Sequence, residues 1–424
     1  MKILWVSSAA IGPASRILEL PYGGSSGTWI QSEFERLKGS DNVQMSFLCP
    51  IRPEGGQKYI TKQTEEGVAY GICYSPFITY GKELPEAVKT LIEDIIKKID
   101  PDIIHIWGTE SSFSAGVATL ANEYNKVIFI QGLIGIHQRY ISPHYVREKK
   151  YWGRVSPIAK LKNAIKRYYF RKQIPLEQKA ISATGNIITD NALTKAYCLS
   201  FCPQTRFFQH FLAPNFAYYE SKWDYDKCEK YSVFTIFTLD KSKGLAQLLK
   251  AIKIAKQTIP DIKLVVPGPF NLGSNNTINP QNCTSFEKWV YNYIKENNLV
   301  ENVEFCGRLS VEEMVAHYRR ANCFVSPSCM EVHSTSVRES MAIGTPTIAS
   351  MCGSMIELIK QRENGYIYRF EEEEMLAYYL LQILESPSLA KKIGTAARDS
   401  MKKLTDDEND SSILDIYNSI LGNR

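Results

Sequence analysis

Short runs of β-branched residues alternate with longer helical patterns along this chain of 424 residues, and the alternation occurs twice. The first series ends near residue 215. After a looser, aromatic stretch the order resumes with "SVFTIFTL" and then the helical "GLAQLLKAIKIAKQTI". Strands that alternate with helices build parallel sheets covered by helices on both faces. The pattern therefore predicts an α/β protein with two doubly wound, Rossmann-like parallel-sheet domains.

The length agrees with two domains, because 424 residues exceed what one hydrophobic core usually supports. We expect residues 1–220 to form the first domain and residues 232–404 the second. A C-terminal helix at about 405–424 is expected to pack back on the first domain. In open parallel sheets, ligands bind beyond the carboxyl ends of the strands, so a site is expected in the loops that follow them.

The composition is that of a soluble globular protein, with 44% hydrophobic and 22% charged residues. No apolar run approaches the roughly 18 residues needed to span a bilayer. The ten cysteines are dispersed without a C-x-x-C pair, which argues against a zinc site and favours a reducing cytoplasm. The start, "KILWVSS", is typical of a buried strand rather than a signal peptide, so we expect a cytoplasmic protein.

Basic residues are concentrated in the segment 147–172, which holds ten Lys and Arg against one acid, although the net charge of the chain is only +5. Aromatic and aliphatic residues are interleaved with these bases. Such a segment resembles an interfacial helix drawn to anionic lipid. A solvated helix whose aromatic residues face the core is an equally good interpretation. Nucleic acid is disfavoured, because no recognised binding module accompanies the cluster.

Two glutamates, Glu331 and Glu339, follow the strand "CFVSPS" in the stretch "SCMEVHSTSVRESMAIGTP". A spacing of eight residues is roughly 12 Å in a helix and 26 Å when extended. That range brackets a nucleoside diphosphate sugar, and it fits poorly the roughly 5–9.5 Å between the carboxyls of glycoside hydrolases. The alternative is an exposed Glu on an ordinary helix.

The turn between the glutamates is rich in donors that suit phosphate. A strand-to-helix turn presents free backbone amides at the positive end of a helix. Lys243, at the loop-to-helix junction after the first strand of the second domain, offers an ammonium to phosphate oxygens. The side chains available in the turn are those of His333, Ser334, Thr335 and Ser336.

Glycines and polar residues end several other strands. Gly268 and Gly307 end two strands of the second domain, and Gly23 and Gly24 follow the first strand of the chain. The latter pair permits close backbone approach to a ligand, but "GGSSG" is not the G-x-G-x-x-G dinucleotide motif, so a dehydrogenase is disfavoured. Polar side chains at two strand ends of the first domain predict an acceptor pocket: His105, Glu110, Gln131 and His137.

The tract from "VEFCGRL" to "GTPTIAS" resembles the donor-binding core of retaining glycosyltransferases of family 4, the glycosyl transferases group 1, which have the GT-B fold. The family pattern is Pro-Ser, a Glu, seven residues, a second Glu, Ala-Met-Ala and Gly-x-Pro. Ser340 replaces the usual first Ala. The residues that match are Pro327, Ser328, Glu331, Glu339, Met341, Ala342, Gly344 and Pro346, with Lys243 and Gly244 upstream. The resemblance is strong over about 233–370 and colinear over 1–215, and it implies two domains facing a cleft.

The resemblance also implies roles for single residues. Glu331 would contact the donor sugar and Glu339 the ribose hydroxyls, while Lys243 would bind the diphosphate. The amides of His333–Thr335 would cradle that diphosphate, and Gly23-Gly24 would close over it. Enzymes of this family need no metal and no cofactor beyond the nucleotide sugar, retain the anomeric configuration, and act mainly by stabilising the leaving group.

The chain departs from the family pattern at three places. Thr238 stands where the family usually has an Arg, so one cation for the diphosphate is missing. Val332-His333-Ser334 replaces the usual Gly-Phe-Gly, and Gln131 replaces a His at a strand end unless His137 substitutes for it. These departures concern the donor and catalysis rather than the fold.

We therefore expect a retaining hexosyltransferase that moves a sugar from a UDP or GDP donor to a glycan or lipid-linked acceptor in surface polysaccharide or lipopolysaccharide synthesis. The basic segment 147–172 would hold it at the inner membrane face. One alternative is a non-catalytic GT-B protein that binds a glycan or a partner. Another is a hydrolase that uses Glu331 and Glu339 as acid and base.

Overall fold

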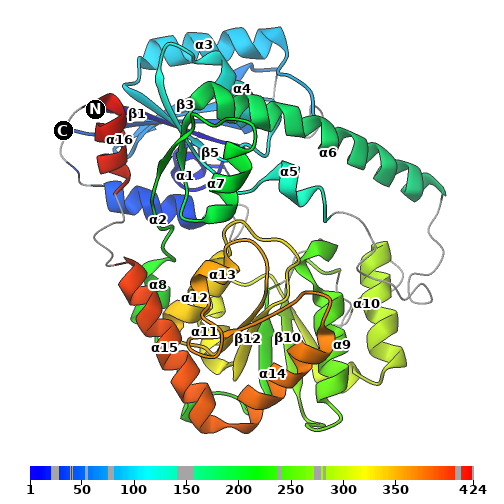
Figure 1. Cartoon of the computed structure of the whole chain (residues 1–424). Helices are drawn as coiled ribbons and strands as arrows, with labels where there is room; N and C mark the ends of the chain where they lie inside the picture. The colour runs from blue at the N-terminus through cyan, green and yellow to red at the C-terminus, as the bar shows by residue number, and fades with distance from the viewer. Residues whose placement is uncertain are drawn as a thin grey trace. The chain divides into compact units, whose positions relative to one another are not determined.

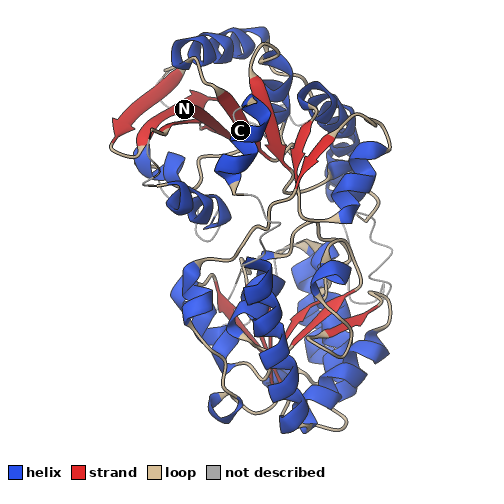
Figure 2. Cartoon of the chain, turned by 60° about the vertical axis from the view of Figure 1, so that its left-hand side comes forward, coloured by secondary structure: helices blue, strands red, loops and turns tan. Residues whose placement is uncertain are grey.

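The computed structural model describes the whole chain except residues 21–27, 39, 41, 53–55, 75–80, 141–156, 237–239, 272–277, 280–282, 406–411 and 423–424. The side chains of residues 28, 158–160, 162, 163 and 166 are also outside the described part. The chain divides into two compact units. The first comprises Met1–Arg139, Leu161–Ala213 and Asp407–Arg424, and the second comprises Tyr140–Lys160 and Pro214–Asp406. Each unit is built around one sheet with helices packed against it (Figure 2).

The sheet of the first unit has the strand order β3-β4-β2-β1-β5-β6-β7-β8 and is parallel except for the β3–β4 pair. Its central strands β1 and β5 are almost continuously apolar, as expected for strands covered on both faces. The strands are β1 (Lys2–Ser7), β2 (Gln44–Ile51), β3 (Tyr59–Thr64), β4 (Gly67–Cys73), β5 (Ile103–Trp107), β6 (Asn125–Phe129), β7 (Asn186–Ile188) and β8 (Arg206–Phe208). The helices are α1 (Pro13–Ile17), α2 (Thr28–Leu37), α3 (Glu86–Ile99), α4 (Ser112–Leu120), α5 (Ile134–His137), α6 (Pro157–Thr184), α7 (Ala192–Leu199) and α16 (Ile413–Leu421).

The antiparallel hairpin β3–β4 is an addition that the sequence pattern did not predict. Strand β3 forms the sheet edge and exposes most of its side chains, so it lacks the apolar run that is typical of a buried strand. Gly67 opens β4 with a φ of +135°. A Cβ at this position would lie 2.4 Å from the carbonyl oxygen of Met45, so only glycine fits.

The sheet of the second unit is fully parallel, with the order β11-β10-β9-β12-β13-β14. Its strands are β9 (Ser232–Thr235), β10 (Lys263–Pro267), β11 (Val303–Gly307), β12 (Cys323–Ser326), β13 (Thr347–Ser350) and β14 (Tyr366–Tyr368). The helices are α8 (Phe216–Glu220), α9 (Leu245–Ala255), α10 (Ser285–Glu296), α11 (Val311–Arg320), α12 (Thr335–Ile343), α13 (Met355–Leu358), α14 (Glu373–Glu385) and α15 (Pro387–Thr405). Short 3-10 turns are η3 (Tyr225–Lys227), η4 (Lys241–Lys243) and η5 (Val300–Asn302). The predicted pair of doubly wound sheets is thus present, and no described helix is both long and apolar enough to cross a bilayer.

The C-terminal helix α16 (red in Figure 1) belongs to the first unit, and its Tyr417 is fully buried there. The hydroxyl of Tyr417 accepts a hydrogen bond of 2.9 Å from the Trp5 indole and lies 2.6 Å from His105 Nδ1. His105 is itself completely buried, and burial lowers its pKa well below the ordinary value. The prediction that His105 lines an acceptor pocket is therefore wrong, because its strand directs this ring into the core.

Replacing Tyr417 by Phe should destabilise the first unit by about 1–3 kcal/mol, because a buried indole N–H and a buried imidazole nitrogen lose their partner. Denaturant unfolding followed by tryptophan fluorescence measures the change. The control is Tyr59→Phe, since Tyr59 is exposed in the same unit. Equal stability of Y417F and wild type would contradict the structural role of this contact.

Candidate functional site

The strand order of the second unit reverses between β9 and β12, which are adjacent strands at the middle of the sheet. At such a switch point the loops that leave the two strands run to opposite faces of the sheet. A crevice therefore opens outside the carboxyl ends of the strands at this position. The loop after β9 carries Lys243, and the loop after β12 carries Glu331.

Lys243 and Glu331 form an ion pair across this switch point, with 2.6 Å between Nζ and Oε1. The side chain of Lys243 is 31% exposed and that of Glu331 is 12% exposed, so both groups remain open to a ligand. Burial disfavours the charged form of Lys243, but the charge and hydrogen bond of Glu331 outweigh it, and the pKa of Lys243 is raised. The ammonium is thus held in place and fully protonated near neutral pH.

The loops around this pair are fixed by close backbone contacts. The amide of Cys329 donates a 2.7 Å hydrogen bond to the carbonyl of Ser242, which ties the loop after β12 to the loop after β9. A Cβ on Gly244 would lie 1.8 Å from the carbonyl oxygen of Pro327, and its φ is +73°. Gly353, after β13, approaches the carbonyl of Glu331 still more closely, since a Cβ there would lie 1.5 Å away. Only glycine fits at either position.

Two helices begin at the same place without a side-chain cap. Helix α9 starts after Gly244 and helix α12 after Ser334, and neither N-cap residue makes a capping hydrogen bond with its side chain. By contrast, α10 and α11 both begin with a complete capping box. The amides of a first turn have no partner within the helix and carry partial positive charge. The switch point therefore combines an ammonium with two helix starts suited to an anion.

The four predicted donors between the glutamates lie at or just before the start of α12. Ser334 is buried, and its Oγ lies 3.3 Å from Oγ of Ser336. His333, Thr335 and Ser336 are half-buried. This turn follows Glu331 directly in the chain and leads into the helix that leaves the switch point.

Glu339 lies on α12, where its carboxylate is held by tyrosines that sequence reasoning missed. The hydroxyl of Tyr318 donates to Glu339 Oε2 at 3.0 Å and contacts the carbonyl oxygen of Ser336, also at 3.0 Å. Burial raises the pKa of Glu339 to about 7, although hydrogen bonds from Tyr318 and Tyr218 lower it. Helical spacing alone gives no sign of these partners, because they come from α11 and α8.

The predicted glycines of the second unit lie at the same sheet edge, farther from the switch point. Gly268, with a φ of +146°, donates its amide to the carbonyl of Gly307 at 2.7 Å. They follow β10 and β11, whereas the ion pair follows β9 and β12. Gly23, Gly24 and Thr238 lie outside the described residues.

In the first unit, Glu110 and Gln131 follow β5 and β6, which are adjacent parallel strands. A Cβ on Gly132 would lie 2.6 Å from Glu110 Oε1, which places this carboxyl against the strand end of β6. Burial raises the pKa of Glu110 to about 7, and the charge of Glu177 adds to the rise, whereas backbone hydrogen bonds from Glu110 and Gly132 oppose it. Gln131 Nε2 is buried and has no hydrogen-bond partner among the described residues.

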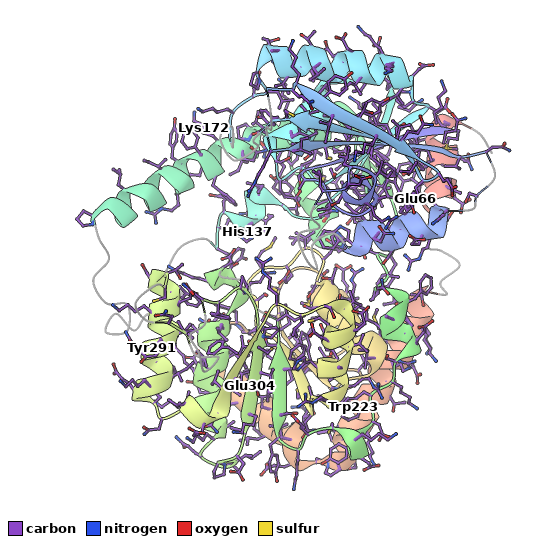
Figure 3. All side chains as sticks on the ribbon, turned by 180° about the vertical axis from the view of Figure 1, so that it is seen from behind. Glu66, His137, Lys172, Trp223, Tyr291 and Glu304 are labelled. Carbon is purple, nitrogen blue, oxygen red and sulfur yellow. The ribbon has the colours of Figure 1, made fainter. Side chains whose placement is uncertain are left out.

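His137, the last residue of α5, is half-buried, and its ring centroid lies 5.8 Å from that of Phe170 on α6 (Figure 3). Of the four predicted pocket residues, the structure therefore leaves Glu110, Gln131 and His137 at strand ends or just after them. Whether they bind an acceptor stays a prediction.

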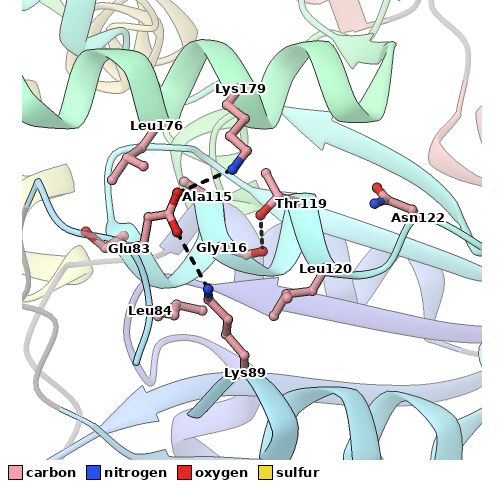
Figure 4. A pocket seen from close by; sticks show the side chains of 11 residues that line it. Glu83, Leu84, Lys89, Ala115, Gly116, Thr119, Leu120, Asn122, Leu176 and Lys179 are labelled. Atoms are coloured by element: carbon pink, nitrogen blue, oxygen red, sulfur yellow. Dashed lines mark hydrogen bonds and ion pairs between the residues drawn. The ribbon is translucent and has the colours of Figure 1, made fainter. Parts of the chain in front are cut away.

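A pocket of about 320 Å³ lies elsewhere in the first unit, between residues of α3, α4 and α6 (Figure 4). Leu84, Leu120 and Leu176 form its apolar wall. Glu83 pairs with Lys179 at 3.3 Å and with Lys89 at 3.6 Å, and Lys89 also pairs with Glu86 at 2.7 Å, so each cation has a carboxylate partner. None of the residues predicted for a site lines this pocket, and we assign it no function.

The raised pKa of Glu339 predicts a pH-dependent stability. The unfolded chain ionises this carboxyl near its ordinary value of 4.5 and the folded chain only near 7. Between these pH values the Glu339 carboxyl is protonated in the folded state and ionised in the unfolded state. The folded protein is therefore most stable below about pH 4.5, and its free energy of unfolding falls as the pH rises through about 7.

Glu339→Gln should remove this pH dependence. Between pH 4.5 and pH 8 the free energy of unfolding of wild type should therefore fall by about 2–3 kcal/mol relative to that of E339Q. Denaturant unfolding at the two pH values measures it. Glu385→Gln, at an exposed position on α14, is the control and should leave the pH profile unchanged. Parallel profiles for E339Q and wild type would contradict the assignment.

Comparison with known proteins shows what the second unit is similar to. Residues 220–400 match the model of the family described as glycosyl transferases group 1. The lipopolysaccharide core biosynthesis mannosyltransferase LpcC of Rhizobium leguminosarum is 30% identical over 125 residues, which are 29% of this chain and 35% of LpcC. Alignments with the first curated relatives span 33% to 47% of the length of those relatives.

Solved structures extend the likeness to the whole chain. Sucrose-phosphate synthase from Thermosynechococcus elongatus has a TM-score of 0.69 at 17% identity, with 95% of both chains covered. Anabaena HepE in complex with UDP-glucose has a TM-score of 0.63 at 14% identity, with 100% of this chain and 98% of that chain covered. At such identities the likeness shows the fold alone. Residues 220–400 are therefore similar to the glycosyl transferases group 1 family, and the chain shares the GT-B fold of these solved structures.

Proposed function

We propose that the protein is a retaining glycosyltransferase that moves a hexose-type sugar from a nucleoside diphosphate donor to a hydroxyl group of a glycan or lipid-linked acceptor. The observation that carries this proposal is the Lys243–Glu331 pair at the switch point, beside two uncapped helix starts. A diphosphate needs cations and amide donors, and a sugar needs a carboxylate that accepts from its hydroxyls. The match of residues 220–400 to the glycosyl transferases group 1 model supports the same function.

In the proposed reaction, the bond between the anomeric carbon and the diphosphate oxygen breaks, and its electron pair leaves on the diphosphate. The acceptor hydroxyl forms the new bond to the anomeric carbon on the face that the diphosphate leaves, and it passes its proton to the departing diphosphate oxygen. Lys243 and the first turns of α9 and α12 stabilise the negative charge that develops on the leaving group. Lys243 therefore acts as an electrostatic catalyst, in keeping with its raised pKa.

The two glutamates bind different ends of the donor in this proposal. Glu331 contacts the sugar and also keeps the Lys243 ammonium in position, since the two side chains are paired. Glu339 accepts from the ribose hydroxyls while Tyr318 holds one of its oxygens. The amides of His333–Thr335 receive the diphosphate. We place no metal ion in this step, because the Lys243 ammonium and the amides of the two helix starts supply the positive charge.

For the acceptor side we propose the strand ends of the first unit, where Glu110 and Gln131 present polar groups and His137 follows on α5. The likeness to LpcC, whose name assigns it to lipopolysaccharide core biosynthesis, supports an acceptor in surface polysaccharide or lipopolysaccharide synthesis. The likeness of the fold to HepE bound to UDP-glucose supports a uridine donor, with a guanosine donor as the other candidate. The basic segment 147–172 supports work at the inner, cytoplasmic face of a membrane.

Two other functions remain as alternatives. A non-catalytic protein would bind a glycan or a partner without transferring a sugar, as Thr238 in place of the family's Arg suggests. A hydrolase would use Glu331 as an acid or base, but its pairing with Lys243 suits an ionised carboxylate better than a proton donor. Incubation with labelled UDP and GDP sugars separates these functions. A transferase moves the label to an acceptor and releases the nucleoside diphosphate, a non-catalytic protein releases none, and a glycoside hydrolase is active without any nucleotide donor.

The site assignment predicts which ligand stabilises the second unit. A bound nucleotide sugar at a hundred times its Kd should raise the free energy of unfolding by about 2.7 kcal/mol. Thermal unfolding with UDP-glucose and GDP-mannose measures the shift. Lys243→Ala should reduce it strongly, whereas Lys253→Ala, an exposed lysine on α9, should not. A full shift in K243A would contradict the site.

A further inference from the structure

Helix α6 carries an exposed apolar stripe. Leu161, Ile165 and Tyr168 are 61%, 47% and 57% exposed, and they are three of the ten large hydrophobic side chains exposed among the described residues. Their spacing of four and then three residues sets them along one face of the helix. In Figure 1 this part of α6 extends away from the sheet of its unit.

Cations accompany the stripe. Arg167, Arg171 and Lys172 are exposed, and within the described part of the chain they form no ion pair. Lys172, labelled in Figure 3, continues the apolar face one turn further, and its Nζ lies 5.5 Å from the ring centroid of Tyr168. The sequence of α6 contains no acidic residue before Glu177. The exposed half of the helix is thus apolar along one line and positively charged beside it.

The other half of α6 is anchored in the first unit by two buried polar side chains. Gln173 accepts hydrogen bonds of 3.0 Å from the amide of Gly81 and from the hydroxyl of Ser112. Glu177, which is completely buried, accepts from the amides of Ile134 and Gly135 at 2.7 and 3.0 Å. These amides start α5, directly after the strand end that carries Gln131.

Further contacts join α6 to the same strand ends. Glu177 also accepts from Tyr197 Oη at 2.8 Å, and its Oε2 lies 3.5 Å from Thr109 Oγ1. Thr109 precedes Glu110, and Phe170 contacts His137. One helix therefore has an exposed amphipathic half and a buried half bonded to the loops after β5 and β6.

We propose that the stripe of Leu161, Ile165 and Tyr168, with Arg167, Arg171 and Lys172, docks on an anionic lipid bilayer, and that α6 thereby presents the loops after β5 and β6 to a lipid-linked acceptor. The docking rests on the described residues alone, and its link to an acceptor rests on the proposed function. Cations attract anionic headgroups, aliphatic side chains enter the acyl boundary, and Tyr is favoured at the interface between them. A nucleic acid would use the cations but leave the aliphatic stripe in water.

Co-sedimentation of the full chain with phosphatidylcholine vesicles, with and without one quarter phosphatidylglycerol, tests the docking. Binding should require the anionic lipid and weaken at high salt. Arg167→Gln/Arg171→Gln/Lys172→Gln should lower partitioning by roughly fivefold for each cation removed. Its charge-matched control is Lys58→Gln/Lys97→Gln/Lys98→Gln, which changes exposed lysines elsewhere in the same unit. Leu161→Gln/Ile165→Gln should also release the protein, unlike Leu199→Gln on α7.

Amide hydrogen exchange of the bound protein tests the link to the acceptor loops. Anionic vesicles should slow exchange over residues 132–137 in wild type and not in the triple α6 variant. The docking would be overturned if the protein bound neutral and anionic vesicles equally, or if the control variant lost as much binding as the triple α6 variant. It would also be overturned if the protein formed concentration-dependent dimers that L161Q/I165Q abolishes. Vesicle binding without slowed exchange would overturn the link.

The thermal shift with nucleotide sugars is measured on the same variants, because it depends on the second unit and not on α6. A normal nucleotide shift without vesicle binding overturns this inference and leaves the proposed function intact. Vesicle binding without any nucleotide shift overturns the proposed function and leaves the docking intact.

Discussion

The ion pair between Lys243 and Glu331 joins the loops that leave the two central strands of the second sheet, and the rest of the site is arranged around it. Its position follows from backbone constraints. Gly244 and Gly353 let the loops after β9 and β13 approach the loop after β12 more closely than any Cβ permits. Because those contacts are made by the main chain, the ammonium and the carboxylate are positioned before any ligand arrives. Such preorganisation is what stabilisation of a leaving diphosphate requires.

The first unit is built on a different principle, since two of its helices are fixed by buried polar contacts rather than by apolar packing alone. Tyr417 attaches the C-terminal helix to Trp5 and His105. Glu177 attaches α6 to the loop after β6. A buried polar group is costly unless it is paired, so each contact specifies one register for its helix. The Glu177 contact places α6, which is distant in sequence, beside the strand ends where we propose acceptor binding.

The two parallel sheets could be predicted because buried strands appear as short apolar runs and amphipathic helices as a repeat of apolar residues every three to four positions. Both patterns occur along the chain. Sequence reasoning missed β3, β8 and β14, which lie at sheet edges, and β4, which pairs with β3. Lys243 and Glu331 could be placed at strand ends, but their pairing depends on which strands are neighbours. The error at His105 has the same origin, since periodicity does not tell which face of a strand meets the core. Tyr318, Gly353 and Glu177 gave no local signal, because their partners are distant in sequence.

The central claim is that Lys243 binds the diphosphate, and comparing diphosphate with monophosphate nucleotides tests it most directly. Calorimetric titration gives Kd values for UDP and UMP, or for GDP and GMP, with wild type and with Lys243→Ala. The account predicts that wild type favours the diphosphate by roughly ten- to hundredfold, the worth of one charge-assisted contact, and that K243A loses this preference while still binding the monophosphate. A preference for the diphosphate that persists unchanged in K243A would contradict it.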